Sequence, residues 1–272
     1  MKAISKSAGT VCTILALLLV LAACRANRAV SADAPAEVEE ARKLIALTFD
    51  DGPHRSTTTE LLDGLAQRGA HATFFLIGKQ IEGSEDLIRR MDEEGHQIGM
   101  HTFDHVILTG LNRVDFDAQV EKSRQLLENI VSHGGFPLRP PYGLYDEHVR
   151  AMAECPIILW NVDPEDWRGK NADRIAQHII SHAEDGAVVL LHDIYPTSVE
   201  AALRAVDTLQ AQGFQFVTVE ELFCARGIEP EDGEAYLNAD WKADYTRTAM
   251  SSGSGAVSSS HAPVNGWSSE SR

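Results

Sequence analysis

The sequence predicts a single α/β domain folded as a distorted (β/α) barrel of about seven parallel strands. The chain has 272 residues, of which 44% are hydrophobic, and this is enough for one sizeable core but not for a second enzyme-sized domain. Short apolar runs, often β-branched, alternate with helical patterns, as is typical of parallel sheets. Polar residues fall at the ends of five of these runs. A barrel brings all its strand ends to one mouth, whereas an open sheet concentrates a site near one switch point.

The individual elements follow from this alternation. Strands are predicted at residues 44–49, 72–77, 96–100, 136–139, 156–161, 187–192 and 215–219. Helices are predicted between most of them, because Ser, Thr, Asp or Asn stands where a helical pattern begins. The predicted helices cover residues 56–66 and 84–94, a longer stretch from residue 115 past residue 130, and residues 171–183 and 197–212.

The N-terminus is predicted to be an export signal. An apolar stretch at residues 11–23 follows Lys2 and Lys6, and it is too short to favour a spanning helix of about 20 residues. It ends in Leu-Ala-Ala-Cys, residues 21–24, which resembles the bacterial lipoprotein cleavage box. We therefore expect residues 1–23 to be removed, Cys24 to be acylated, and residues 24–42 to tether the domain to a membrane outside the cytoplasm. The alternative is an ordinary signal or an uncleaved anchor with an incidental cysteine.

The charge of the chain limits its partners. The formal net charge is −16, and loss of residues 1–23 makes it more negative because that segment holds two lysines and no acids. This excludes a nucleic-acid-binding groove and disfavours a patch for anionic lipid, so the membrane contact is expected to come from the lipid anchor alone. Residues 43–226 are expected to form the folded domain, and residues 227–272 an acidic and then Ser/Gly-rich flexible tail.

Two cysteines, Cys155 and Cys224, lie within the expected folded domain. A disulfide between them is permitted outside the cytoplasm. However, Cys155 abuts a predicted strand and Cys224 a predicted helix, where single buried cysteines are ordinary. Both alternatives stay open.

Two neighbouring carboxylates, Asp50 and Asp51, end the first predicted strand, directly before Gly-Pro at residues 52–53. A bend at this point brings both toward one pocket, and like charges so close repel each other unless a cation joins them. His101 and His105 are the obvious co-ligands. One carboxylate with two imidazoles leaves an open position on a Zn²⁺-like ion.

Each of these signals is weak alone. A lone Asp-Asp-Gly-Pro is usually a solvated turn. His178 and His182 have the same spacing as the two candidate ligands, but they lie in a predicted helix without an acidic strand-end partner. We interpret that pair as surface or packing residues.

Five segments occur together and in order along the chain: Thr-Phe-Asp-Asp-Gly-Pro at 48–53, His-Thr-Phe-Asp-His at 101–105, Arg-Pro-Pro-Tyr-Gly at 139–143, Asp-Pro-Glu-Asp-Trp at 163–167 and Leu-Leu-His-Asp at 190–193. Together they resemble the motifs of the polysaccharide deacetylases of carbohydrate esterase family four. The resemblance covers residues 43–226, and the combination is specific although no single segment is. It implies a distorted (β/α) barrel that removes acetyl groups from N-acetylated sugars with one divalent metal ion, Zn²⁺ or Co²⁺.

The resemblance also implies roles for the strand-end residues. Asp51, His101 and His105 would bind the metal, which polarises the acetyl carbonyl and activates water. Asp50 would be the general base. Arg139 resembles the family arginine that fixes this base through charge-assisted hydrogen bonds.

Further roles follow from the same likeness. The backbone N–H of Tyr142 would stabilise the oxyanion. His192 would protonate the departing amine, with Asp166 orienting its imidazole. Trp167 and Leu190 would form apolar walls for the sugar and the acetyl group.

The expected function is removal of N-acetyl groups from N-acetylglucosamine or N-acetylmuramic acid in peptidoglycan, because an exported, lipid-tethered bacterial protein faces its own cell wall. Chitin oligomers or acetylxylan are the alternative substrates within the same chemistry. A non-catalytic sugar-binding protein is the alternative of a different class. The complete set of catalytic residues argues against it.

Overall fold

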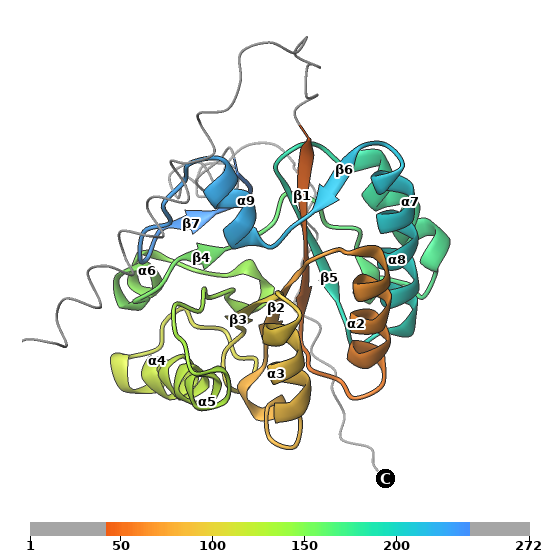
Figure 1. The fold of residues 1–272 in the computed structure, drawn as a ribbon. Coiled ribbons are helices and arrows are strands. Elements are labelled where there is room, and N and C mark those ends of the chain that lie inside the picture. The colour runs from red at the N-terminus through yellow and green to blue at the C-terminus, as the bar shows by residue number, and fades with distance from the viewer. Residues whose placement is uncertain (1–41, 240–272) are drawn as a thin grey trace, which may run out of the picture. The chain divides into compact units, whose positions relative to one another are not determined.

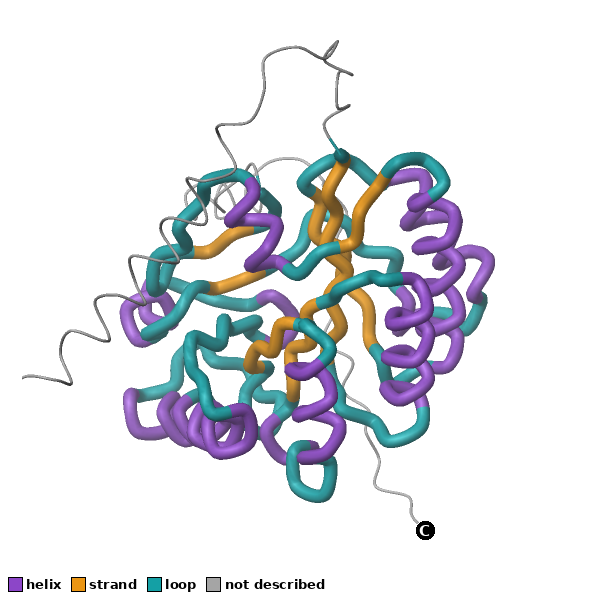
Figure 2. Tube along the Cα trace, in the orientation of Figure 1, coloured by secondary structure: helices purple, strands orange, loops and turns teal. Residues whose placement is uncertain are grey.

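The computed structural model describes residues 42–239. Parallel strands gather at the centre of this region and helices surround them (Figures 1 and 2). The predicted signal with Cys24, the tether as far as residue 41, and residues 240–272 lie outside the described residues. The strands are β1 (Lys43–Asp50), β2 (Thr73–Leu76), β3 (Gln97–Met100), β4 (Ile157–Ile158), β5 (Ala187–His192), β6 (Phe214–Phe216) and β7 (Ala235–Tyr236).

Strand β1 is the centre of the sheet. It pairs in parallel with β5 on one side, and on the other with β6 near its start and β2 near its end. β3 follows β2 in the same direction. Isolated parallel bridges continue the ring from Met100 to Leu138, from Leu138 to Ile157, and from Val162 to Val189 on β5. The prediction of a distorted (β/α) barrel of parallel strands is thus confirmed, and the carboxyl ends of its strands meet at one mouth.

Two of the predicted strands are reduced to a bridge or a pair of residues, and β6 ends at Phe216 instead of residue 219. Residues 136–139 form only bridges at Leu138, and within residues 156–161 only Ile157–Ile158 is a strand. Pro137 and Pro156 explain part of this difference, because proline has no N–H to donate to a ladder. The segment after Leu138 nevertheless stays in the ring, since Arg139 N donates to Met100 O at 2.9 Å.

Helices cover the outside of the ring, and α2, α8 and α7 pack side by side in that order (Figure 1). The single long helix expected from Asp115 is in fact two helices that meet at Val120, with Asn112 as the N-cap of the first. Among residues 42–239, no helix is both long and apolar enough to cross a membrane. The helices are α2 (Thr57–Arg68), α3 (Glu85–Glu93), α4 (Arg113–Gln119), α5 (Glu121–Val131), α6 (Glu147–Met152), α7 (Ala172–His182), α8 (Pro196–Gln210) and α9 (Val219–Ala225), with 3-10 turns η1 (Gly78–Gln80), η2 (Pro141–Gly143) and η3 (Asp166–Arg168).

The core has two parts because successive strand residues face opposite sides. On β1, Ile45 and Leu47 belong to the large cluster packed under the helices, whereas Ala46 points into the inner cluster with Phe75 and Val188. The barrel interior is therefore filled mainly by apolar side chains, with the guanidinium of Arg139 buried beside Phe75. The polar residues predicted to take part in chemistry lie at the mouth formed by the carboxyl ends of the strands.

The packed domain extends beyond residue 226, where we expected a flexible tail to begin. β7 pairs in parallel with β4, Tyr236 and Ala239 are buried, and Ala239 N donates to Gly186 O at 3.1 Å. The reason is that the free edge of β4 and the inner cluster accept the few apolar residues of this acidic stretch. Cys155 is buried and Cys224 exposed, and both are free thiols.

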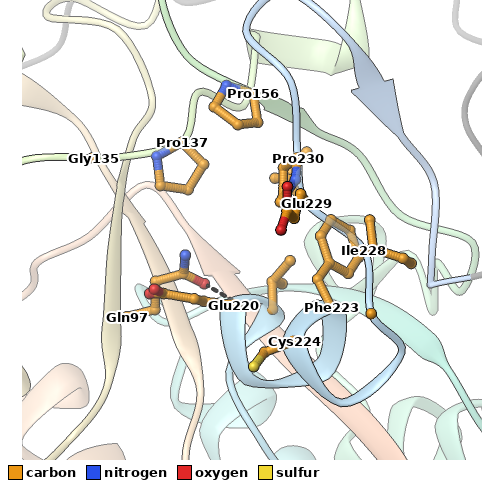
Figure 3. A pocket seen from close by; sticks show the side chains of 13 residues that line it. Gln97, Gly135, Pro137, Pro156, Glu220, Phe223, Cys224, Ile228, Glu229 and Pro230 are labelled. Atoms are coloured by element: carbon orange, nitrogen blue, oxygen red, sulfur yellow. Dashed lines mark hydrogen bonds between the residues drawn. The ribbon is translucent and has the colours of Figure 1, made fainter. Parts of the chain in front are cut away.

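A cavity of about 470 Å³ lies beside α9 (Figure 3). Pro137 and Pro156 form one wall, and Phe223 and Ile228 another. Gln97, the first residue of β3, also lines it, so the cavity is at the amino-terminal ends of the strands. It is therefore separate from the strand-end polar residues described next.

Candidate active site

The end of β1 brings its two carboxylates to the same site. Asp50 is the last residue of the strand and is 3% exposed, while Asp51 follows in the left-handed region with φ 72°. This backbone conformation breaks the alternation of a strand, in which neighbours would face opposite sides. As a result, His101 Nε2 lies 3.8 Å from Asp50 Oδ2 and 3.6 Å from Asp51 Oδ1.

Asp51, His101 and His105 form a group suited to a cation. His105 Nε2 is 3.5 Å from Asp51 Oδ1, and one potential ligand atom of each residue lies within 4.8 Å of the others. Asp51 Oδ1 is buried without a hydrogen-bond partner among the described residues, which is costly unless a cation compensates it. The residues present thus fit the metal implied by the sequence motifs.

The two histidines present the correct nitrogens. His101 Nδ1 donates to the carbonyl oxygen of Arg139 at 2.7 Å, so its Nε2 lone pair faces the site. Burial, with the neighbouring His101, lowers the pKa of His105 and favours the neutral form that a metal ligand requires. The His105 ring also meets the Tyr142 ring edge-on at 5.0 Å between centroids.

Arg139 holds Asp50 from inside the barrel. Its fully buried guanidinium donates from Nη1 to Asp50 Oδ1 at 2.8 Å and to Thr48 Oγ1 at 2.6 Å. Its remaining nitrogens donate to the carbonyls of Ile158 at 3.0 Å and Leu159 at 2.8 Å. Oδ1 of Asp50 therefore accepts a hydrogen bond from Arg139, whereas Oδ2 faces His101.

His192, which is partly exposed, and the buried Asp166 form a second pair at the same mouth. His192 Nδ1 donates to Asp166 Oδ1 at 2.7 Å, and the backbone N–H of His192 donates to Oδ2 at 2.8 Å. Ser198 Oγ donates to the same Oδ2 at 2.6 Å. Burial alone would lower the pKa of His192, but the hydrogen bond and charge of Asp166, with Asp50 and Asp51, outweigh it and raise the pKa to about 9.

The expected wall residues differ in their exposure. Tyr142 is 58% exposed and Trp167 41% exposed, so both rings are accessible at the rim, whereas Leu190 is 4% exposed within β5. Tyr142 has φ 63° inside η2, a conformation that turns the loop over after Pro141. The structure thus brings Tyr142 against His105 and leaves Leu190 mostly covered by its neighbours.

Several supporting residues were not predicted as such from the sequence. Asp193 is fully buried, accepts a hydrogen bond from Thr58 Oγ1, and has its pKa raised by burial to about 7. A Cβ added at Gly52 would lie 2.5 Å from Asp193 Oδ1, so only glycine fits against this carboxyl group. The sequence signal was present but ambiguous, because an aspartate after a histidine can equally cap a turn.

His178 and His182 stack on α7 with ring centroids 4.1 Å apart. Among residues 42–239, the group formed by Asp51, His101 and His105 is the one set of three or more side chains close enough to hold a metal. The interpretation of the α7 pair as surface or packing residues agrees with this geometry.

A family model described as polysaccharide deacetylase matches residues 37–156. A peptidoglycan-N-acetylglucosamine deacetylase of Bacillus cereus is 34% identical over 196 residues, which are 68% of this chain and 91% of that protein. The chain belongs to the polysaccharide deacetylase family. The resemblance predicted from the five segments is confirmed.

Other polysaccharide deacetylases are similar along most of the folded domain. The peptidoglycan-N-acetylmuramic acid deacetylase PdaC of Bacillus subtilis is 38% identical over 185 residues, which are 68% of this chain but 40% of PdaC. A family 4 acetyl xylan esterase of Clostridium thermocellum, solved with a cobalt ion, matches with TM-score 0.70 and 27% identity, covering 73% of this chain and 100% of that structure. The chain therefore spans less than half the length of PdaC.

Proposed function

We propose that this polysaccharide deacetylase uses a divalent metal ion to remove N-acetyl groups from the amino sugars of peptidoglycan. The observation that carries the proposal is the environment of Asp50. Arg139 occupies its Oδ1, and its Oδ2 lies 3.8 Å from His101 Nε2, beside the group that fits a cation. Two adjacent aspartates thus have different roles, Asp51 as a ligand and Asp50 as a base.

Asp51, His101 and His105 would hold the metal. When bound, a divalent cation supplies Lewis acidity for the acetyl carbonyl and for the attacking water. Zn²⁺ is the proposed ion because one carboxylate and two imidazoles form a common ligand set for it, and Co²⁺ is accommodated by the same donors.

The attack step uses Asp50 and Tyr142. Asp50 Oδ2 accepts a proton from water while the water oxygen bonds to the acetyl carbon, and Arg139 keeps the carboxylate fixed at 2.8 Å. The carbonyl oxygen gains negative charge in this step. The backbone N–H of Tyr142 is proposed to donate to that oxygen.

The departure step uses His192. Its imidazolium gives a proton to the sugar nitrogen as the C–N bond breaks, so the products are acetate and the free amino sugar. A pKa of about 9 supplies the protonated form at neutral pH, and Asp166 holds the ring through Nδ1 at 2.7 Å. Trp167 and Tyr142 at the rim, with Leu190 beneath, are proposed as the walls for the sugar and the acetyl group.

Peptidoglycan is the proposed substrate because both the B. cereus and B. subtilis relatives are named as peptidoglycan deacetylases. Chitin oligomers and acetylxylan are the second candidates. A chitooligosaccharide deacetylase of Bradyrhizobium is 34% identical over 195 residues, and the C. thermocellum structure is an acetyl xylan esterase.

The proposed location is the outer side of the cytoplasmic membrane, with Cys24 as the lipid attachment site. The support is the apolar stretch at residues 11–23 followed by Leu-Ala-Ala-Cys. A Cys24→Ala variant expressed in a bacterium should lose incorporation of labelled fatty acid and shift from the membrane fraction. Equal labelling of both proteins would contradict the lipoprotein assignment.

Two variants separate the base from the ligands. Asp50→Asn is expected to bind Zn²⁺ as the wild type does and to lose acetate release by at least about 10²-fold, whereas Asp51→Ala is expected to lose both. Metal binding is measured by calorimetry on chelator-treated protein. An active Asp50→Asn variant would show that Asp50 is not the base.

The substrate is tested by acetate release from purified peptidoglycan, chitin oligomers and acetylxylan in parallel, with added Zn²⁺ or Co²⁺. The largest kcat/KM is expected on peptidoglycan. Activity restricted to acetylxylan or chitin would contradict the proposed substrate but not the proposed deacetylation mechanism. Metal binding without acetate release from any substrate would favour the non-catalytic alternative.

A further inference from the structure

The two histidines of the candidate metal site are supported differently. His101 directly follows β3, its backbone N–H donates to Leu76 O at 2.9 Å, and its Nδ1 is fixed by Arg139 O. His105 lies in the loop that follows, outside any strand. Thr102 and His105 both have positive φ, 63° and 58°, a conformation that non-glycine residues keep only where their surroundings impose it. The position of His105 therefore depends on what holds this loop.

One side of the loop is held through its carbonyl groups. Gly78 N donates to Thr102 O at 2.9 Å, and Lys79 N donates to Phe103 O at 3.0 Å. Both donors belong to η1, so this contact joins the loop to the end of β2. The amide groups of the loop need another partner.

Gln119, the last residue of α4, is that partner. Its Oε1 accepts hydrogen bonds from Asp104 N at 2.9 Å and Phe103 N at 3.2 Å, and its Nε2 donates to Asp104 Oδ2 at 3.1 Å. The two N–H donors and the carboxylate acceptor determine which way this side-chain amide points. The backbone carbonyl of Gln119 accepts from Ser123 Oγ at 2.9 Å, which ties the position to α5.

We propose that Gln119 is a positioning residue for the metal site. It acts through the backbone of residues 103–104, holding the loop so that His105 Nε2 stays 3.5 Å from Asp51 Oδ1. Asp104, the carboxylate between the two histidines, serves the same purpose and is turned toward Gln119. This inference rests on the proposed role of Asp51, His101 and His105 as metal ligands.

Residues that orient metal ligands typically contribute 10- to 100-fold to metal affinity. Gln119→Ala removes both acceptor contacts to the loop amides, so its Kd for Zn²⁺ should rise by about this factor. The measurement is calorimetry on the chelator-treated full chain, with circular dichroism to verify folding. Co²⁺ offers a second readout, because a displaced His105 would change its visible absorption spectrum.

Gln210→Ala is the matched control. Gln210 is the last residue of α8, is half-buried like Gln119, and donates from Nε2 to Arg68 O at 2.9 Å. Its truncation removes the same atoms from a helix end away from the candidate site, and the Zn²⁺ affinity should not change. Equal weakening in both variants would overturn the proposal, because it would show a general loosening of the domain.

A swap of partners tests the contact itself. Gln119→Glu keeps an acceptor for the loop amides but sets two carboxylates against each other, and it should weaken Zn²⁺ binding. In the double variant with Asp104→Asn, the new side-chain amide can donate to the carboxylate at position 119, and most of the Zn²⁺ affinity should be recovered. Asp104→Ala alone should weaken Zn²⁺ binding less than Gln119→Ala does, because Gln119 still accepts both hydrogen bonds from the loop amides.

The outcomes separate this inference from the function on which it rests. A wild-type protein that binds neither Zn²⁺ nor Co²⁺ would overturn both. A wild type that binds metal and releases acetate, with Gln119→Ala binding Zn²⁺ within about twofold of it, would overturn only the role of Gln119. If Gln119→Ala does not fold, the comparison of Gln119→Glu with its Asp104→Asn double variant decides, and absence of recovery contradicts the proposal.

Discussion

Arg139 Nη1 donates to Asp50 Oδ1 at 2.8 Å in a pair that the barrel buries almost completely. The guanidinium also lies over the Phe75 ring, 4.0 Å from its centroid, and bonds Thr48 and two backbone carbonyls. Replacing both partners of a buried ion pair with apolar residues typically changes the stability little. Removing only one partner is destabilising, because it leaves the other charge buried and uncompensated. Arg139 therefore connects the stability of the barrel with the position of the proposed base.

Arg139→Met should destabilise the protein by about 3–5 kcal/mol, because it leaves Asp50 buried without its partner. It should also lower kcat/KM by at least about 10²-fold through loss of base positioning. Urea unfolding and acetate release measure the two effects. Arg113→Met, which breaks exposed ion pairs with Asp117 and Glu154, is the control and should cost less than about 1 kcal/mol. A loss for Arg139→Met as small as that of the control would contradict the buried-pair interpretation.

The pH dependence of turnover should report the pair of His192 and Asp166. His192 has its pKa raised to about 9, so it is protonated below that pH and the rate should fall as pH rises through it. Asp166→Asn removes the main contact that raises this pKa, and the alkaline limb of kcat/KM should move to lower pH by at least about one unit. The profiles of both proteins are measured on one soluble substrate. Coincident alkaline limbs would show that another group is the acid.

Tyr142 is predicted to act through its backbone and its ring separately. Tyr142→Ala keeps the N–H proposed for the oxyanion but removes a ring that is 58% exposed at the rim. KM should rise about tenfold with kcat within a few-fold of wild type, because the ring is proposed to contact the sugar, although its edge-on contact with His105 is lost as well. Tyr142→Phe, the control, should leave both values nearly unchanged. A loss confined to kcat in Tyr142→Ala would mean that the ring is needed to shape the site.

His96 should make the folded state sensitive to acid away from the active site. Burial, with the nearby charges of His71 and Arg90, lowers its pKa to about 4, and Ala72 N donates to its Nδ1 at 3.1 Å. A group with a depressed folded-state pKa contributes its stability above its ordinary value of 6.5 and loses it as pH falls toward about 4. The loss is on the order of 3 kcal/mol.

His96→Gln keeps an acceptor for the Ala72 amide but cannot gain a proton. The unfolding free energy of the wild type should therefore fall relative to that of the variant as pH is lowered from 7 to 4. Urea titrations at several pH values measure this change. This comparison cancels the contribution of the other histidines. A difference that stays constant over this range would contradict the depressed pKa.

The family, the parallel (β/α) barrel and the strand-end residues could all be predicted from the sequence. The alternation of apolar runs indicates strands buried in a sheet, and Asp50, His101, Arg139 and His192 each lie at or directly after the end of such a run. The shortened strands near Pro137 and Pro156 and the packing of residues 227–239 were not predicted. Pairing of a short strand such as β7 depends on a free edge elsewhere in the chain, and no local pattern encodes that edge.

The contacts that the candidate residues make with one another follow from the packing of the barrel and could not be predicted from any local pattern. Arg139 and Asp50 are 89 positions apart, and the oxygen that Arg139 leaves free depends on how β1 and the segment after Leu138 are placed in the ring. Gln119 has no motif around it, yet its amide meets the loop between His101 and His105 because α4 ends there. Residue types and strand ends are local properties that a sequence carries directly. Hydrogen bonds between distant side chains depend on backbone placement to within a few tenths of an ångström, and folding alone determines that placement.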